Sequence, residues 1–237
     1  LTGQLPPQSG MARILGRDVG RDDPVTQGEI GVCFEEKNLY DAMSGEENLR
    51  FFGSLYGMKS VDTTALLERV GLADRASDRV GSYSKGMRQR LMVARSILHQ
   101  PMVLFLDEPT DGLDPVSSKA IRGIIREEAA RGAAVLLTTH DMWEADELSH
   151  RVAFINEGQI YAIDTPETLK LQPGQRAVKV RRRDDAGVHE ESVSLDDPDV
   201  GEQLRAAVES DGLMTIHTEE STLENIFVEM TGRTLEA

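Results

Sequence analysis

The stretch VLFLDEPTDGLD, residues 103–114, decides the fold. Four apolar residues run directly into Asp107 and Glu108, and a short continuous apolar run is typical of a buried parallel strand. Ligands bind just beyond the carboxyl ends of such strands in open α/β sheets. Asp107 is therefore placed to hold Mg²⁺, and Glu108 to orient a water for attack on a phosphate. The alternative is a core strand that ends in a charged turn.

Composition narrows the class of protein. The chain has 237 residues, 39% of them hydrophobic, which allows one sizeable core and a small second domain. A net charge of −15 argues against non-specific nucleic-acid binding. Cys33 is the only cysteine, and its apolar surroundings predict a buried, inert thiol in a reducing compartment. No run approaches the ~18 apolar residues of a membrane-spanning helix, so a soluble protein is predicted, with any membrane role supplied by a partner.

A strand–helix–strand unit follows from the hydrophobic pattern. A helix is expected over 116–131, with Gly132 as its stop, and a second apolar, buried strand over 133–139. Such a unit joins parallel neighbours whose carboxyl ends share one edge of the sheet. His140 is therefore expected near Asp107 and Glu108, although a lone histidine is more often structural.

The remaining pattern predicts two domains. Residues 1–171 form the main α/β domain, with a helical region at about 38–100, and residues 172–237 form a small α+β domain. The Arg181–Arg183 run in the small domain is interpreted as a solvated strand end in preference to a binding patch. The expected strands cover 11–15, 30–34, 152–155, 159–163, 177–182, 190–194 and 213–218. The expected helices cover 44–56, 63–70, 84–99, 143–148, 200–209 and 222–230, and a further short helix starts at 165–166.

Residues 84–87, Ser-Lys-Gly-Met, lie where a helix is expected to begin. The first turn of a helix presents N–H groups and the positive end of its dipole, which suit a phosphate. Ser84 adds a hydroxyl, and Gly86 allows close approach of the backbone. Alone, the motif is weak evidence for a phosphate site, but the LDEPTDGLD and TTHD stretches that follow it strengthen that prediction.

This order of motifs resembles the ATP-binding cassette (ABC) ATPases of membrane transporters. YSKGMRQR (83–90) is similar to the family's signature motif, VLFLDE (103–108) to its Walker B strand and catalytic glutamate, and GLD (112–114) to its D-loop. His140 is similar to the switch histidine. NLRFFGSLYG (48–57) and STLENIFVEMTGR (221–233) resemble the daunorubicin-resistance type of drug exporter subunit most closely.

The resemblance implies a P-loop NTPase fold and ATP hydrolysis with Mg²⁺ on the cytoplasmic face of a membrane. Two such subunits would sandwich ATP and drive a separate integral membrane subunit, without nucleic acid. Phe51, Phe52 and Tyr56 could line the groove for that subunit, or could be core. The implied roles are catalytic for Glu108 and His140, metal binding for Asp107 and Glu35, and nucleotide binding for Ser84, Lys85, Gly86, Met87, Asp114 and Glu35.

Three departures from the family pattern stand out. The phosphate-cradling loop reads G-x-x-x-x-G-K-[ST], yet no Gly-Lys pair occurs in the chain. The N-terminal LTGQLPPQSG resembles the segment just after that loop, so the loop and the first strands are expected to lie outside this sequence. Glu35 stands where the family usually has glutamine, and Lys85 and Met87 differ from the commonest signature. Two alternatives therefore stay open: a binding module with little nucleotide affinity, and a soluble non-transport cassette protein.

We expect the 237-residue chain by itself to bind ATP weakly. Without the loop, the β- and γ-phosphates lose the backbone N–H groups and the lysine that neutralise them. Titration with a fluorescent ATP analogue measures this directly. Micromolar affinity together with Mg²⁺-dependent turnover would contradict the expectation.

Overall fold

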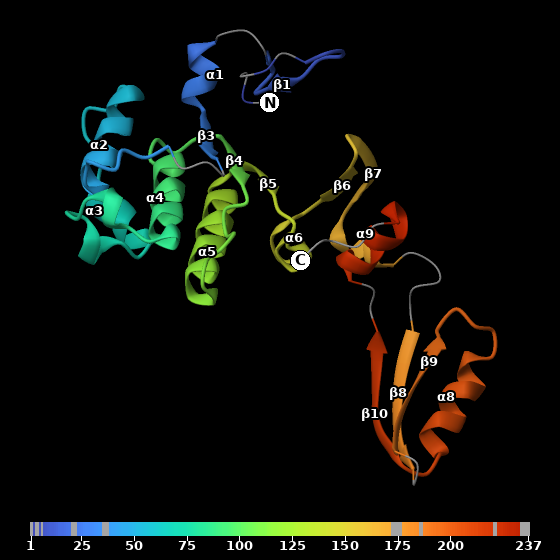
Figure 1. The fold of residues 1–237 in the computed structure, drawn as a ribbon. Coiled ribbons are helices and arrows are strands. Elements are labelled where there is room, and N and C mark those ends of the chain that lie inside the picture. The colour runs from blue at the N-terminus through green and yellow to red at the C-terminus, as the bar shows by residue number, and fades with distance from the viewer. Residues whose placement is uncertain are drawn as a thin grey trace. The chain divides into compact units, whose positions relative to one another are not determined.

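The computed structural model describes residues 2, 5, 7–19, 23–34, 38–171, 177–184, 187–219 and 222–232. The chain divides into two compact units, residues 1–139 and 140–237, which are described separately (Figure 1). The division falls earlier in the chain than the expected domain boundary at residue 171. Within the described residues, no helix combines the length and the apolar character needed to cross a membrane.

A parallel sheet forms the centre of the first unit. Its order is β3 (Ile30–Cys33), β4 (Val103–Asp107) and β5 (Ala134–Thr138), with β4 in the middle. α5 (Pro115–Arg131) connects β4 to β5, which confirms the expected strand–helix–strand unit. The expectation of full burial is wrong for β5, whose residues are half-buried or exposed. The reason is its edge position, since β4 is the only strand paired with it in the described part of the unit.

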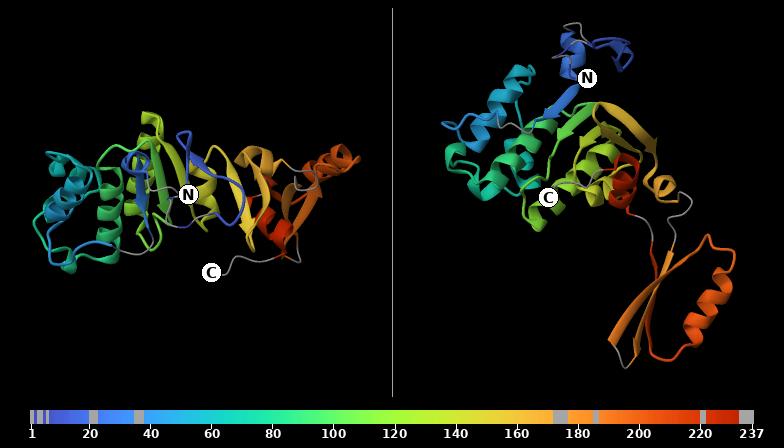
Figure 2. Two further views of the ribbon diagram at one scale, coloured as in Figure 1. Left: turned by 90° about the horizontal axis from the view of Figure 1, so that it is seen from above. Right: turned by 45° about the vertical axis from the view of Figure 1, so that its right-hand side comes forward.

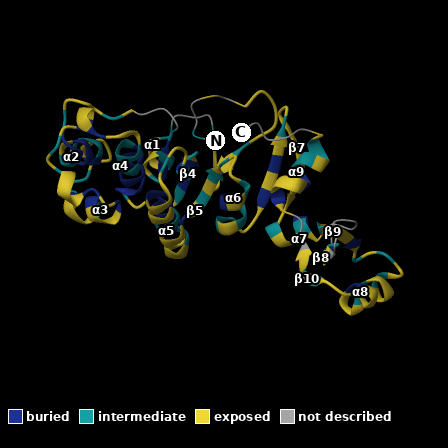
Figure 3. Cartoon of the chain, turned by 60° about the horizontal axis from the view of Figure 1, so that its bottom comes forward, coloured by how far each residue is buried: buried dark blue, intermediate teal, exposed yellow. Residues whose placement is uncertain are grey.

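The close packing of α4 (Lys85–Ile97) on the sheet depends on one glycine. A Cβ atom at Gly31 of β3 would collide with the carbonyl oxygen of Ser96 and lie 2.8 Å from Cγ of Pro101. Only glycine permits this approach of strand and helix. The helix is buried along most of its length, as the dark blue in Figure 3 shows. Its apolar residues Leu91, Met92 and Ile97 are at most 2% exposed, and their burial stabilises the unit.

Two further helices pack beside α4. α2 (Gly45–Leu55) begins with a capping box in which Ser44 and Glu47 exchange hydrogen bonds, as the sequence predicts. α3 (Thr63–Arg69) is capped by Asp62. Short 3₁₀ turns at Ala73–Arg75 and Val80–Ser82 lead from α3 to α4. Earlier in the chain lie β1 (Arg13–Ile14), which falls within the expected strand over 11–15, and β2 (Arg17–Asp18) and α1 (Pro24–Gly28), which were not expected.

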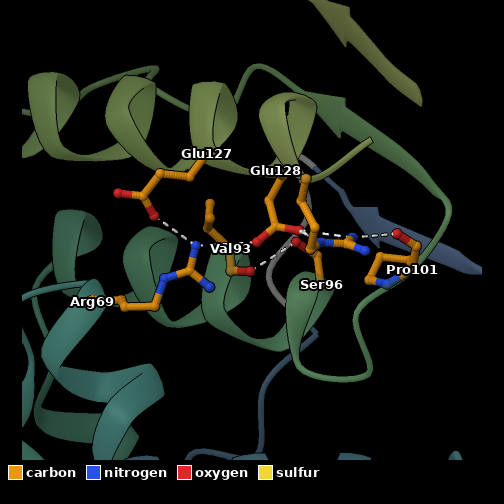
Figure 4. Close-up of polar contacts among 7 residues, drawn as sticks. Arg69, Val93, Ser96, Pro101, Glu127 and Glu128 are labelled. Atoms are coloured by element: carbon orange, nitrogen blue, oxygen red, sulfur yellow. Dashed lines mark hydrogen bonds and ion pairs between the residues drawn. The ribbon is translucent and has the colours of Figure 1, made fainter. Parts of the chain in front are cut away.

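A buried carboxylate joins α5 to α3 and to the loop before β4 (Figure 4). The side chain of Glu128 is only 5% exposed. It accepts hydrogen bonds from Arg69 at 3.1 Å and from Arg131 at 2.9 Å, and Arg131 also donates to the carbonyl oxygen of Pro101 at 2.5 Å. The neighbouring Glu127 pairs with Arg69 at 2.8 Å but is 64% exposed. The two glutamates therefore share a partner and differ in burial.

The second unit contains two hydrophobic clusters. α6 (Met142–Leu148), the hairpin β6 (Val152–Asn156) and β7 (Gln159–Asp164), and α7 (Pro166–Lys170) enclose the first cluster with α9 (Leu223–Thr231). Its fully or nearly fully buried members include Phe154, Leu169, Leu223 and Ile226. α9 thus packs with residues 140–171, although its position in the sequence predicted that it belongs to the small domain.

The second cluster is the predicted α+β element. β8 (Ala177–Asp184) lies between β10 (Leu213–Glu219) and β9 (Gly187–Ser194) in an antiparallel sheet. α8 (Val200–Glu209) lies alongside this sheet (Figure 2). Val178, Val180 and Ala207 are its buried centre. Arg181 pairs with Glu190 and Arg182 with Glu191 across the sheet, in keeping with a solvated strand end.

We expect Glu128→Ala to lower the free energy of unfolding by about 2–3 kcal/mol, because two arginines lose a desolvated partner. Glu127→Ala is the matched control, and its exposed ion pair predicts a change within about 0.5 kcal/mol. Urea denaturation followed by circular dichroism compares the two variants. Equal effects would show that burial of the Glu128 carboxylate is not the decisive difference.

Candidate functional site

The carboxyl edge of the sheet brings a carboxylate and a hydroxyl together. Asp107 ends β4, and Thr138 ends β5 directly opposite it in the register. The Thr138 hydroxyl donates a hydrogen bond to Oδ1 of Asp107. Asp107 remains exposed at this edge, where ligands of parallel sheets bind. The geometry thus places Asp107 where the sequence analysis expects it.

Glu108 has an unusual backbone conformation. Its φ is 45°, in the left-handed region that a non-glycine residue adopts only at a cost of order 1 kcal/mol. Its N–H donates to the carbonyl oxygen of Thr138 at 3.0 Å, and its own carbonyl accepts from the N–H of Asp111 at 3.2 Å. These two bonds hold the chain in a sharp turn as it leaves β4. The half-buried Glu108 is therefore fixed at the same edge as Asp107.

The turn after Glu108 ends at the cap of α5. Asp114 accepts hydrogen bonds from the backbone N–H groups of Val116 and Ser117, each at 3.0 Å, and from the Ser117 hydroxyl at 2.6 Å. The Ser117 hydroxyl and backbone bonds lower the pKa of Asp114 below its usual value. In this chain Asp114 is a helix-capping residue, and its predicted contact with nucleotide stays a prediction.

Residues 84–87 form the start of α4, as predicted. The Ser84 hydroxyl accepts a hydrogen bond from the N–H of Met87 at 3.2 Å and so caps the helix. A Cβ atom on Gly86 would lie 3.2 Å from Cδ2 of Leu113. The Lys85 ammonium donates to Oδ2 of Asp111 at 2.8 Å. The structure thus brings the Ser-Lys-Gly-Met motif beside the turn at 111–114.

Sequence reasoning missed one buried cation near the site. Arg95, on α4, donates to the carbonyl oxygen of Asn38 at 3.0 Å and to its side-chain oxygen at 2.5 Å. It also donates to the carbonyl oxygen of Val32 at 3.4 Å and lies 4.6 Å from the centre of the Phe52 ring. Burial lowers the pKa of its guanidinium. An arginine among apolar residues, LMVARSIL, was the available signal.

The predicted Glu35 site lies outside the described residues. Arg95 contacts the chain on both sides of it, at Val32 and Asn38. Cys33, two residues before Glu35, is fully buried, and burial raises the pKa of its thiol to about 12. The expected burial of the thiol is confirmed, and its raised pKa is in keeping with an inert thiol. The metal and nucleotide roles of Glu35 stay predictions.

His140 begins the second unit, two residues after β5 ends at Thr138. Its approach to Asp107 and Glu108, which belong to the first unit, stays a prediction.

The aromatic residues predicted to line a docking groove contact other rings of the first unit. Phe51 meets Tyr40 and Phe52 edge-on at ring distances of 4.9 and 5.4 Å. Tyr56 stacks on His99 at 3.8 Å.

The residues present fit a magnesium nucleotide better than a metal alone. Within the described residues, no group of three or more His, Cys, Asp or Glu is arranged to hold a metal ion. Magnesium typically takes one or two carboxylates and completes its shell with water and substrate phosphates. The exposed Asp107 carboxylate beside the Thr138 hydroxyl suits that role. A parallel sheet with such a carboxyl edge, next to a helix start, defines a nucleotide-binding α/β domain.

Comparison with known proteins identifies the family. The family described as "ABC transporter" matches residues 1–111. The fluoroquinolones export ATP-binding protein of Mycobacterium tuberculosis is 45% identical over 240 residues, covering 99% of this chain and 78% of the relative. The doxorubicin resistance ATP-binding protein of the same organism is 40% identical over 182 residues, covering 75% of this chain and 55% of the relative.

A solved structure agrees with these relatives. The ATP-binding subunit of an ABC transporter is 27% identical, with a TM-score of 0.65, over 71% of this chain and 72% of that one. The chain belongs to the ABC transporter family, as an ATP-binding subunit. Both the resemblance inferred from the motifs and the predicted P-loop NTPase fold are confirmed, and ATP hydrolysis is the activity of this family.

We expect Glu108→Gly to be more stable than Glu108→Ala by about 1 kcal/mol, the reverse of the usual order, because glycine adopts φ of 45° without steric cost. Both variants lose the same side-chain contacts, so their difference reports the backbone alone. Urea denaturation of the two proteins measures it. A more stable alanine variant would show that residue 108 does not hold the left-handed conformation in solution.

Proposed function

We propose that this protein hydrolyses ATP to energise a drug exporter whose membrane-spanning part is a separate subunit. The observation that carries the proposal is the contact of two motifs, the Ser-Lys-Gly-Met start of α4 and the turn after Asp107 and Glu108. The transported substrate would be a drug or a lipid-like molecule, and the relatives whose printed names mention export of fluoroquinolones or resistance to doxorubicin support a drug.

In this proposal each residue at the carboxyl edge has one task. Asp107 would hold Mg²⁺, which neutralises the phosphates when bound. Glu108 would accept a hydrogen bond from the attacking water and orient it. His140 would contact the γ-phosphate, and Glu35 would add a second carboxylate toward the metal. Phosphoryl transfer needs positioning and charge neutralisation more than covalent participation.

A second copy of the chain would complete the site. Ser84 and Lys85 are exposed at the start of α4, where the helix dipole is positive. The N–H groups of Lys85 and Gly86 lie in the first turn of α4 and have no helical carbonyl one turn before them, while the N–H of Met87 donates to the Ser84 hydroxyl. We therefore assign this end of α4 to the phosphates of ATP bound mainly by the partner copy, together with Asp114.

The helical region at about 38–100 would contact the membrane subunit. Its aromatic residues Phe51, Phe52 and Tyr56 lie on or just after α2, and Tyr56 is 40% exposed. Since aromatic side chains are enriched at interfaces, they are the first candidates for that contact. The protein would then act at the cytoplasmic face of the membrane. Co-purification with a multi-spanning membrane protein separates this proposal from a non-transport cassette protein.

We expect Glu108→Gln to abolish ATP hydrolysis while ATP binding survives, because the amide keeps the shape but cannot act as a base. The test uses the protein expressed from its complete coding sequence together with its membrane subunit. Phosphate release reports turnover, and a fluorescent ATP analogue reports binding. Glu127→Gln, on the exposed face of α5, is the control and should keep wild-type rates. Wild-type turnover in Glu108→Gln would exclude the assigned role.

A further inference from the structure

We propose that Lys85 is a positioning residue that ties the candidate catalytic turn to the start of α4. The family's commonest signature motif has a different residue at this position. In this chain the lysine makes a specific contact with Asp111. Its ammonium donates to Asp111 at 2.8 Å across 26 residues of sequence. The inference rests on the proposed function for its catalytic consequence, but not for the contact itself.

Steric contacts show that the tie is more than a surface ion pair. Gly112 has φ of 64°, and a Cβ atom there would collide with Nζ of Lys85 and lie 3.0 Å from its Cε. The lysine stem therefore lies flat against the backbone of the turn. One residue further along α4, Gly86 packs against Leu113. Two consecutive residues of the helix thus contact three consecutive residues of the turn.

A backbone hydrogen bond links Asp111 to Glu108. The N–H of Asp111 donates to the carbonyl oxygen of Glu108 at 3.2 Å. Lys85 therefore restrains Asp111, and Asp111 restrains the left-handed conformation of Glu108. A residue at φ of 45° returns to a relaxed conformation unless its surroundings hold it. We infer that loss of the Lys85–Asp111 pair lets the Glu108 turn loosen.

This arrangement would also couple two sites. In the proposed dimer, the start of α4 faces ATP held by the partner copy, whereas Glu108 acts on ATP held by its own copy. Lys85 contacts the turn of its own Glu108. A phosphate arriving at α4 would compete with Asp111 for the Lys85 ammonium, since a phosphate bears more charge than one carboxylate. Occupancy of one site would therefore change the position of the catalytic carboxylate in the other.

Hydrogen exchange of the nucleotide-free protein tests the tie directly. Lys85→Met keeps the stem that packs on Gly112 and removes the charge, while Asp111→Ala removes the acceptor. Each should raise exchange of the 109–114 amides about two- to fivefold, the range expected for one exposed ion pair. Lys85→Arg should stay near wild type, and the exchanged pair Lys85→Asp with Asp111→Lys should restore protection. Lys119→Met, an exposed lysine on α5, is the matched control.

Kinetics of the protein with its membrane subunit test the consequence. Asp111→Ala should lower kcat severalfold and leave KM for ATP within about twofold, because Asp111 positions Glu108 and does not hold nucleotide. Unchanged exchange in both Lys85→Met and Asp111→Ala would overturn the inference. Unchanged kcat in Asp111→Ala would overturn its catalytic part. A wild-type protein without ATPase activity but with the expected exchange would refute the proposed function alone.

Discussion

The backbone pairing of β4 with β5 determines where the whole candidate site lies. Asp107 faces Thr138 at the last position of the parallel register, so both side chains emerge at one edge. The next N–H, from Glu108, also bonds to Thr138. A slip of one residue would send Asp107 to the other face of the sheet, because side chains alternate along a strand. The register therefore places the carboxylate before any contact with ligand is made.

The approach of α4 to this edge of the sheet depends on glycine residues. Gly31 lets β3 and α4 pack closely at one end of the helix, and Gly86 and Gly112 let the other end meet the turn. A helix held this firmly can carry both the Ser84 cap and the Lys85 contact. In an α/β domain, a site of this kind needs rigid elements because small displacements weaken positioning.

Much of this arrangement could be predicted from the sequence, because hydrophobic periodicity reports local structure. The apolar run before Asp107 and the capping pattern of Ser44 and Ser84 each carry their own signal. Contacts between distant residues leave no such signal. The Lys85–Asp111 pair, the buried Glu128 and the ties of Arg95 depend on packing that only the folded chain creates. The exposure of β5 was missed for the same reason, since an apolar run does not say which neighbours cover it.

The charges around the turn explain why a nucleotide here would need a metal ion. Residues 107–114 contain four carboxylates, and those of Asp107 and Asp114 accept hydrogen bonds from hydroxyl groups. Lys85 is a cation bonded directly to this segment, through Asp111. A polyphosphate that approached this segment without a metal ion would be repelled, because four carboxylates concentrated in eight residues add their repulsion. Mg²⁺ would reverse that repulsion and make the Asp107 carboxylate an attractive ligand. In the proposed function, the acidic turn would therefore favour a nucleotide that arrives with Mg²⁺ over an anion that arrives without a metal ion.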